Sequence, residues 1–355
     1  MEYAALLALT LIGLTAGFLV ESGDDDDDDT DSPTTDGGDG GTGDTGENSD
    51  GAVTSNGVTF GTEGSDSLVA SEGAETVVGG GGDDQITGNA NDNILDGQIG
   101  DDSVFGGGGD DQVFGSEGND SVDGNSGDDI AAGGTGDDII AGGLGNDTLF
   151  GDAGSDLLNG QEDDDQLVGG DGDDTLFGGP GVDTLFGGDG NDSILDGIGE
   201  DTLVGGAGAD TLDGGEGNDK LYGIWDGNDD GVVAARDLDD PDVLLGGLGA
   251  DEIQMGSGDT AFGEEGTDLF MTGTWVNPDN PPEIIDLEDS EVVLVAVPVG
   301  TSEADSITID VDGVSGDSIV QFNGQTVATV SAGAGPVSLD QILVVEIAAL
   351  TQPTV

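Results

Sequence analysis

A nine-residue period runs through the middle of this chain and restricts its fold more than any other feature. With Gly61 as position 1, eighteen nonapeptides follow one another to Tyr222 without an insertion or deletion. Position 1 is Gly in sixteen of them, position 4 is Gly in sixteen, position 6 is Asp in sixteen, and position 8 is Leu, Ile or Val in seventeen. Such a fixed period is typical of a solenoid, in which each repeat packs on its neighbours.

Each repeated position has its own physical role. Glycine at positions 1 and 4 lets the backbone turn tightly and exposes carbonyl oxygens, and Asp at position 6 adds a carboxylate. Positions 7 to 9 suffice only for a short strand, and because side chains alternate across a strand, position 8 alone points inward. Two repeats then form one coil with strands in two layers, and coils lie about 4.8 Å apart. The eighteen repeats predict nine coils around a narrow aliphatic core.

The charge of the chain indicates that it needs cations. Its 355 residues include 79 Asp and Glu but only Lys220 and Arg236 as bases, for a net charge of -77. This charge repels nucleic acid and anionic membranes. The chain has no Cys and no His, which excludes disulfides, thiolate chemistry and imidazole catalysis. Carboxylates about 5 Å apart repel by roughly 3 kcal/mol per pair at an effective dielectric of 20, so we expect a non-catalytic protein that folds only with cations.

The pattern Gly-Gly-x-Gly-x-Asp-x-(apolar)-x, from Gly61 to Tyr222 and less regularly to Met271, resembles the hemolysin-type calcium-binding repeat of the RTX (repeats-in-toxin) family. The resemblance implies an all-β fold, a right-handed parallel β-roll, in which each turn binds calcium together with the turn 18 residues further on. It implies on the order of ten or more calcium ions. Glu75, Asn93, Asn91 and Asp163 depart from the pattern. The metal ligands that it assigns are Asp66, Asp84, Asp102, Asp111, Asp120, Asp129, Asp138, Asp147, Asp156, Asp165, Asp174, Asp183, Asp192, Asp201, Asp210, Asp219 and Asp251.

A second calcium motif interrupts the period after Tyr222. Residues 226–237 resemble an EF-hand loop and, still more, one half of a dockerin, with Gly at the sixth of twelve positions. The resemblance implies ligands at Asp226, Asn228, Asp230, Val232 and Asp237, although position 12 is Asp rather than Glu and there is no second copy. A plain acidic turn is the alternative. Degenerate nonapeptides then follow at residues 246–271.

The two ends of the chain differ from the repeats. Tyr3 to Val20 is apolar and is compatible with a membrane anchor, a cleaved export segment or a buried helix. Residues 21–60 are an acidic linker without hydrophobic period. Residues 272–355 predict a small β domain with strands at 291–297, 306–311, 317–322 and 326–330, and with a hairpin turn at Asn323-Gly324. The apolar, acidic tail from Leu339 resembles the ends of RTX proteins exported by type I secretion.

Position 9 carries an apolar stripe when every second repeat is taken. Its members are Phe114, Ala132, Phe150, Val168, Phe186, Val204 and Tyr222. Because position 9 points away from position 8, we expect an exposed ribbon. The ribbon is compatible with packing against the C-terminal domain, a second copy or another protein through Phe114, Phe150 and Phe186, and equally with strand propensity alone.

These observations favour a secreted or cell-surface calcium-binding protein whose β-roll folds on binding calcium and acts as a structural or adhesive module. The alternative is an accessory calcium-dependent module of a secreted hydrolytic enzyme, such as one acting on carbohydrates. Only the last 84 or so residues leave room for catalysis, and acids there such as Glu283, Asp286 and Glu288 form no evident motif. We therefore expect no enzymatic activity.

Overall fold

The computed structural model describes residues 52–55, 57–71, 76–223, 240–273, 275–288, 290–298, 307–313, 315–331, 333 and 337–347. Three predicted features lie outside them: the apolar segment of residues 3–20, nearly all of the acidic linker, and the EF-hand-like loop of residues 226–237. The end of the apolar C-terminal tail lies outside them as well. Among the described residues there is no helix of the length and hydrophobicity needed to cross a membrane.

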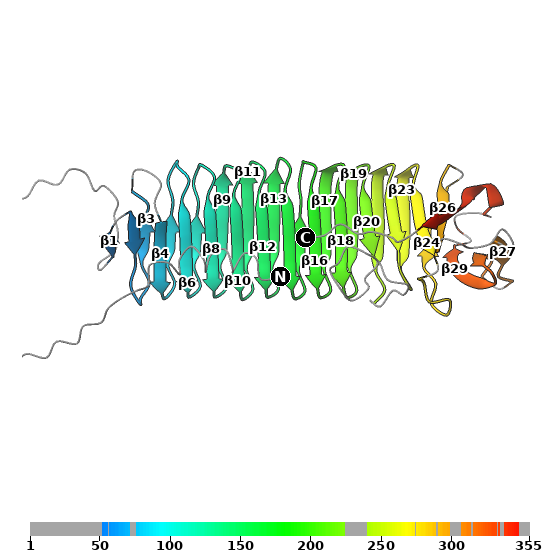
Figure 1. Cartoon of the computed structure of the whole chain (residues 1–355), viewed down its shortest axis with the longest axis horizontal. Coiled ribbons are helices and arrows are strands. Elements are labelled where there is room, and N and C mark those ends of the chain that lie inside the picture. The colour runs from blue at the N-terminus through cyan, green and yellow to red at the C-terminus, as the bar shows by residue number, and fades with distance from the viewer. Residues whose placement is uncertain are drawn as a thin grey trace, which may run out of the picture.

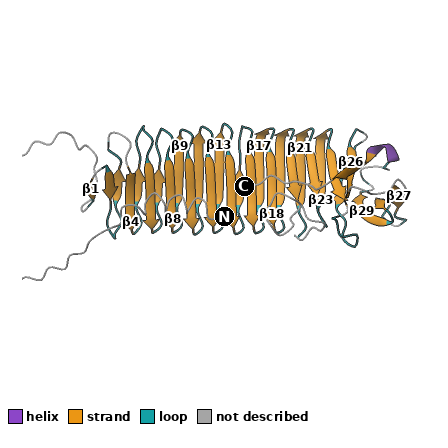
Figure 2. Cartoon of the chain, viewed as in Figure 1, coloured by secondary structure: helices purple, strands orange, loops and turns teal. Residues whose placement is uncertain are grey.

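The described residues form a long solenoid of β-strands stacked side by side along one axis (Figure 1). Two sheets of fifteen strands each make up its two layers, and consecutive strands of the repeat region alternate between them. Strands dominate the structure, and the described residues contain a single short 3-10 helix, at Leu339–Gln341 (Figure 2). The predicted all-β parallel β-roll is therefore confirmed.

The first sheet begins near the N-terminal end of the solenoid with an antiparallel pair and continues with parallel strands. In spatial order it contains β1 (Val53–Ser55), β2 (Val58–Phe60), β4 (Thr76–Gly81), β6 (Ile94–Ile99), β8 (Gln112–Glu117), β10 (Ile130–Thr135), β12 (Thr148–Ala153), β14 (Gln166–Asp171), β16 (Thr184–Asp189), β18 (Thr202–Ala207), β20 (Lys220–Gly223), β22 (Glu252–Met255), β24 (Leu269–Gly273), β26 (Val292–Pro298) and β30 (Ile342–Ile347).

The second sheet contains the intervening strands and ends in an antiparallel meander. In spatial order it contains β3 (Ser67–Val69), β5 (Gln85–Thr87), β7 (Ser103–Phe105), β9 (Ser121–Ser126), β11 (Ile139–Leu144), β13 (Leu157–Glu162), β15 (Thr175–Phe177), β17 (Ser193–Gly199), β19 (Thr211–Gly217), β21 (Val243–Gly249), β23 (Thr260–Gly266), β25 (Glu283–Ile284), β29 (Gln325–Val330), β28 (Ser318–Phe322) and β27 (Ile307–Val311).

The register between neighbouring strands follows from the period. Residues 18 apart stand side by side, as Leu149 of β12 does beside Leu167 of β14. The position-8 side chains of all eighteen repeats are buried in one continuous core between the sheets, from Leu68 to Leu221, as predicted. Because each coil adds only two such side chains, the core is one residue wide in each layer and grows only along the axis.

The solenoid continues without a break past the insertion that contains the EF-hand-like loop. Thr211 of β19 pairs with Val243 of β21, a separation of 32 residues rather than 18, so the coil has 14 extra residues (32 minus 18) outside the sheets. The next separation in this sheet is 17, from Val243 to Thr260. The sheets thus absorb both changes at the turns, and strand pairing keeps its register.

The C-terminal strands extend the two sheets of the solenoid. The predicted strands correspond to β26 to β29, and Asn323 and Gly324 both have positive φ, as the predicted hairpin turn requires. Strand β26 pairs in parallel with β24, and β29 pairs in parallel with β25. Val293, Val320 and Val330 consequently belong to the same core as the repeats.

Candidate calcium sites on the turn edges

The residue at position 6 lies at the point where a turn enters a strand. On each long edge of the solenoid these residues stack with one member per coil, because residues 18 apart occupy neighbouring coils. We call the stack that precedes the first-sheet strands the first-sheet ladder: Asn93, Asp111, Asp129, Asp147, Asp165, Asp183, Asp201, Asp219, Asp251 and Asp268. The second-sheet ladder is Asp66, Asp84, Asp102, Asp120, Asp138, Asp156, Asp174, Asp192, Asp210, Asp242 and Asp259.

One carboxylate oxygen of each ladder residue has a structural role. From Asp84 and Asp111 onward, Oδ1 accepts a hydrogen bond from the backbone N–H of the ladder residue one coil earlier, at 2.7 to 3.1 Å. For example, Asp120 donates from its backbone to Asp138, and Asp138 donates to Asp156. The ladder therefore joins successive coils along both edges.

The other carboxylate oxygen, Oδ2, is buried and has no hydrogen-bond partner in most ladder residues. An uncompensated buried carboxylate oxygen is costly. The residues concerned are Asp84, Asp102, Asp111, Asp120, Asp129, Asp138, Asp147, Asp156, Asp165, Asp174, Asp183, Asp192, Asp201, Asp210, Asp219, Asp242, Asp251 and Asp268.

The glycine at position 1 leaves room beside each free oxygen. A methyl group on Gly151 would meet both Oδ2 of Asp156 and the carbonyl oxygen of Gly169, each at 2.5 Å. The same arrangement recurs one coil further on, where a methyl group on Gly169 would meet Asp174 and Gly187. A carboxylate oxygen and a carbonyl oxygen from the next coil thus converge on one place. These hard oxygen donors fit calcium.

The electrostatics of the ladders also indicate a missing positive charge. Burial raises the pKa of these carboxyl groups above the ordinary value of 3.8, the backbone hydrogen bonds partly oppose the rise, and neighbouring carboxylates add to it in most of them. The pKa is about 6 for Asp102, Asp129, Asp138, Asp174, Asp210 and Asp251, about 7 for Asp111, Asp120, Asp147, Asp156 and Asp219, and about 8 for Asp165 and Asp192. Without a cation, the fold therefore opposes ionisation of its own ladders.

All the predicted nonapeptide ligands stand in these two ladders, but not all have a free oxygen. Oδ2 of Asp66 accepts hydrogen bonds from the backbone and hydroxyl of Thr62. Asn93 uses Oδ1 to accept from the backbone of Asn89, and its buried Nδ2 has no partner. An amide nitrogen cannot bind calcium, so Asn93 interrupts its ladder as a ligand. Glu75 lies outside the described residues.

Several ladder members were missed from the sequence. Asp242 and Asp259 lack the flanking glycine pattern, and only the strand pairing of β21 and β23 places them in register. Asp268 has the full motif at Gly263 to Met271, so the period alone was sufficient to find it.

A second, exposed ladder at position 5 was also missed. Its Asp and Asn side chains accept hydrogen bonds from the backbone of the position-5 residue one coil later, as Asp137 does from Ser155 at 3.0 Å. The signal was present, because position 5 is Asp or Asn in twelve of the eighteen repeats. These side chains face solvent, so they fasten the turns without enclosing an ion.

The expected exposure of the position-9 stripe is wrong for most of its members. Phe114 is 8% exposed and Phe186 is 5% exposed, and Val168, Phe186 and Val204 form an apolar cluster with Phe150 and Tyr222 packed against it. The register explains the cluster, since Phe150, Val168 and Phe186 are neighbours on adjacent strands and pack against one another. The proposed role of the stripe in binding a partner stays untested.

The comparison with known protein families agrees with the geometry. The family of the RTX calcium-binding nonapeptide repeat (4 copies) matches residues 60–95, 87–122, 123–158, 159–194 and 196–230. No curated protein is similar enough to the chain to count as a match. The ladders and the glycine-lined spaces beside them lie in the matched residues and continue past them to Asp268. The solenoid of this chain is therefore an array of RTX calcium-binding nonapeptide repeats, a calcium-binding structural module.

Proposed function

We propose that the chain acts outside the cell, in secreted or surface-held form, as a non-catalytic spacer or adhesive module that calcium makes rigid. The observation that carries the proposal is the column of buried Oδ2 atoms without partners on each edge of the solenoid. Each column is continuous over many coils, so calcium acts on the whole length of the array rather than at one point.

Calcium supplies what the ion-free ladders lack. Neighbouring carboxylates about 5 Å apart repel by roughly 3 kcal/mol per pair at an effective dielectric of 20. An ion between two coils replaces this repulsion by attraction to both, and it binds only when the coils are stacked. Extracellular calcium modules have dissociation constants of about 0.1 to 1 mM. A roll with such sites is unfolded at cytosolic calcium and folds after export.

The shape of the folded array suits a spacer. The second-sheet ladder has eleven members from Asp66 to Asp259, and at about 4.8 Å per coil they span roughly 5 nm. Repeat arrays of this kind fold cooperatively along one axis. Calcium would thereby convert a self-repelling acidic chain into a rod that holds its two ends apart.

The first test is a calcium titration of the full chain followed by far-ultraviolet circular dichroism, with magnesium as the control. We expect a steep rise in β-structure near millimolar calcium and none with magnesium, which keeps its own water shell and demands a smaller site. A β signal that is the same in chelator and in calcium would contradict the proposal.

The location requires a separate test. Cells that express the full chain are fractionated, and the chain is followed in the medium, on the surface and in the cytosol, with and without a chelator wash. We expect it in the medium or on the surface. Confinement to the cytosol would reject the extracellular role and leave calcium binding by the repeats untouched.

A further inference from the structure

Asp196 is a buried carboxylate that the nonapeptide pattern does not explain. It occupies position 1 of its repeat, where sixteen of the eighteen repeats have Gly. It lies in β17 and is 5% exposed, and neither of its carboxylate oxygens has a hydrogen-bond partner. The turn-forming role of position 1 gives no reason for an acid here.

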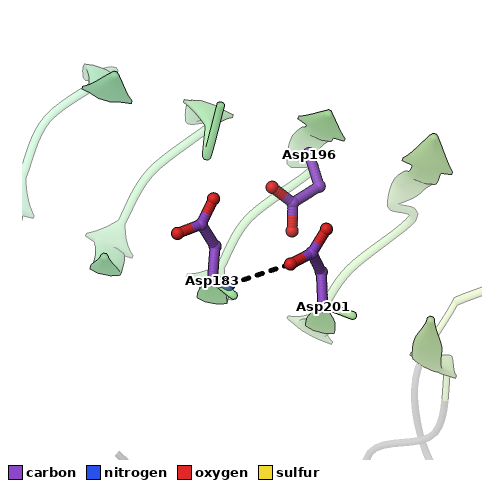
Figure 3. A group of neighbouring side chains, drawn as sticks. All are labelled: Asp183, Asp196 and Asp201. Atoms are coloured by element: carbon purple, nitrogen blue, oxygen red, sulfur yellow. Dashed lines mark hydrogen bonds between the residues drawn. The ribbon is translucent and has the colours of Figure 1, made fainter. Parts of the chain in front are cut away.

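The side chain of Asp196 reaches into the first-sheet ladder. One carboxylate oxygen from each of Asp183, Asp196 and Asp201 lies within 4.8 Å of the other two. In Figure 3 the carboxylate of Asp196 points toward the space between Asp183 and Asp201, which belong to neighbouring coils. Oδ1 of Asp201 accepts from the backbone of Asp183 at 2.9 Å, and Oδ2 of both ladder residues remains free.

Asp196 replaces a neutral donor of the repeat pattern with a charged one. In regular coils, a methyl group on the position-1 glycine would meet the ladder Oδ2 and the carbonyl oxygen of the glycine 18 residues later. Beside Gly178 it would instead meet Oδ1 of Asp196 and Oδ2 of Asp183. A carboxylate oxygen thus takes the place of a glycine carbonyl oxygen in the donor set.

No base compensates this group of three acids. The chain has two basic residues, Lys220 and Arg236, and Lys220 is exposed. Four carboxylate oxygens are buried without partners here: Oδ2 of Asp183, Oδ2 of Asp201 and both oxygens of Asp196. Two ligands of one calcium ion, each at 2.3 to 2.6 Å, lie at most about 5.2 Å apart. The separations within this group satisfy that limit.

We propose that Asp183, Asp196 and Asp201 form a three-carboxylate calcium site, distinct from the repeat sites, that fills at lower calcium than they do. Calcium affinity rises with the number of charged ligands and with the rigidity of the site. Here one more carboxylate is present, and two of the three are fixed by ladder hydrogen bonds. The site lies within the array, so its ion fastens two neighbouring coils before the rest of the ladders fill. It does not depend on where the chain acts.

The test counts tightly bound calcium on the full chain by equilibrium dialysis against calcium buffers. The variants are Asp196→Gly, which restores the residue of the other repeats, and Asp196→Asn. The control is Asp189→Asn, which removes the same charge from an exposed position one repeat earlier. Circular dichroism at saturating calcium checks that each variant is folded, and Asp196→Gly carries the test if Asp196→Asn is not.

We expect the wild type and Asp189→Asn to retain one calcium ion per chain at free calcium about tenfold below the midpoint of the remaining sites. Asp196→Gly and Asp196→Asn should lose that ion and keep the rest. Equal numbers of tightly bound ions in the wild type and Asp196→Gly would overturn the proposal, as would an equal loss in Asp189→Asn. Either result would leave calcium binding by the regular repeats intact.

Discussion

Replacing Asp138 with Asn separates the two roles of a ladder carboxylate. Oδ1 of Asp138 accepts a hydrogen bond from the backbone of Asp120 at 2.7 Å, and an Asn side chain keeps that acceptor. Oδ2 is buried without a partner, and in Asn it becomes an NH₂ group that cannot bind a cation. The substitution therefore removes the ligand while preserving the link between coils.

The expected loss of stability follows from mass action. At free calcium ten times the dissociation constant, each filled site adds about 1.4 kcal/mol to the free energy of unfolding. Asp138 stands between the coils of Asp120 and Asp156, so its removal affects one site or two. The Asp138→Asn variant should lose about 1.4 to 3 kcal/mol in calcium.

The sign reverses when calcium is removed. Burial, and next the charges of Asp137 and Asp152, raise the pKa of Asp138 to about 6, so at pH 8 its ionised form opposes the ion-free fold. In chelator at that pH, the Asp138→Asn variant should have at least as much β-structure as the wild type. A residue that served only to shape the turn would give the same loss in both conditions.

The matched control is Asp137→Asn in the same turn. Asp137 is exposed, and its Oδ1 also accepts a backbone hydrogen bond, from Ser155 at 3.0 Å. Urea unfolding of both variants at buffered calcium, with calcium counted by titration calorimetry, compares the two positions. We expect a change within about 0.5 kcal/mol for Asp137→Asn. Equal losses for the two variants in calcium would refute the assignment of Asp138 as a ligand.

Three further predictions concern pH, the interrupted ladder and the core. In chelator, the folded pKa values of about 6 to 8 stand above the unfolded value near 4, so the ladders stabilise the ion-free roll below pH 4 and lose this contribution as pH rises through 6 to 8; circular dichroism should show more β-structure at pH 4 than at pH 8, and the opposite trend would contradict the shifts. Asn93→Asp should add a calcium ion, counted by calorimetry, because it supplies the carboxylate missing beside Asp111; an unchanged count would show that Asn93 does not limit the ladder. Leu149→Ala should cost about 2 to 5 kcal/mol in urea unfolding at saturating calcium, since Leu149 is fully buried in a core one residue wide; a loss below 1 kcal/mol would show that the core is not the source of stability.

Much of the fold could be predicted because a strict period translates directly into neighbours. Residues 18 apart occupy the same place in adjacent coils, so the buried position 8 and the stacked position 6 follow from the sequence. The same logic failed at Asp242 and Asp259, where the glycines are lost and an insertion changes the spacing. Their places depend on strands β21 and β23 pairing with strands already in the sheet.

Direction and cover depend on the third dimension in a way that the period does not contain. Alternation predicts that Phe186 points away from the core, and only packing along the stripe buries it. Likewise, the free Oδ2 atoms are recognised only when the partner of Oδ1 is known.

The sequence by itself determined the repeat unit, its core residue and its acid, because a nonapeptide that recurs without interruption leaves one way to stack. Tertiary structure alone decided that Asp196 joins Asp183 and Asp201. Asp196 and Asp201 are five residues apart, whereas Asp183 is thirteen residues before Asp196 and belongs to the previous coil. Their meeting depends on the path of the turn between the two sheets, which carries the side chain of Asp196 back toward the coil before it.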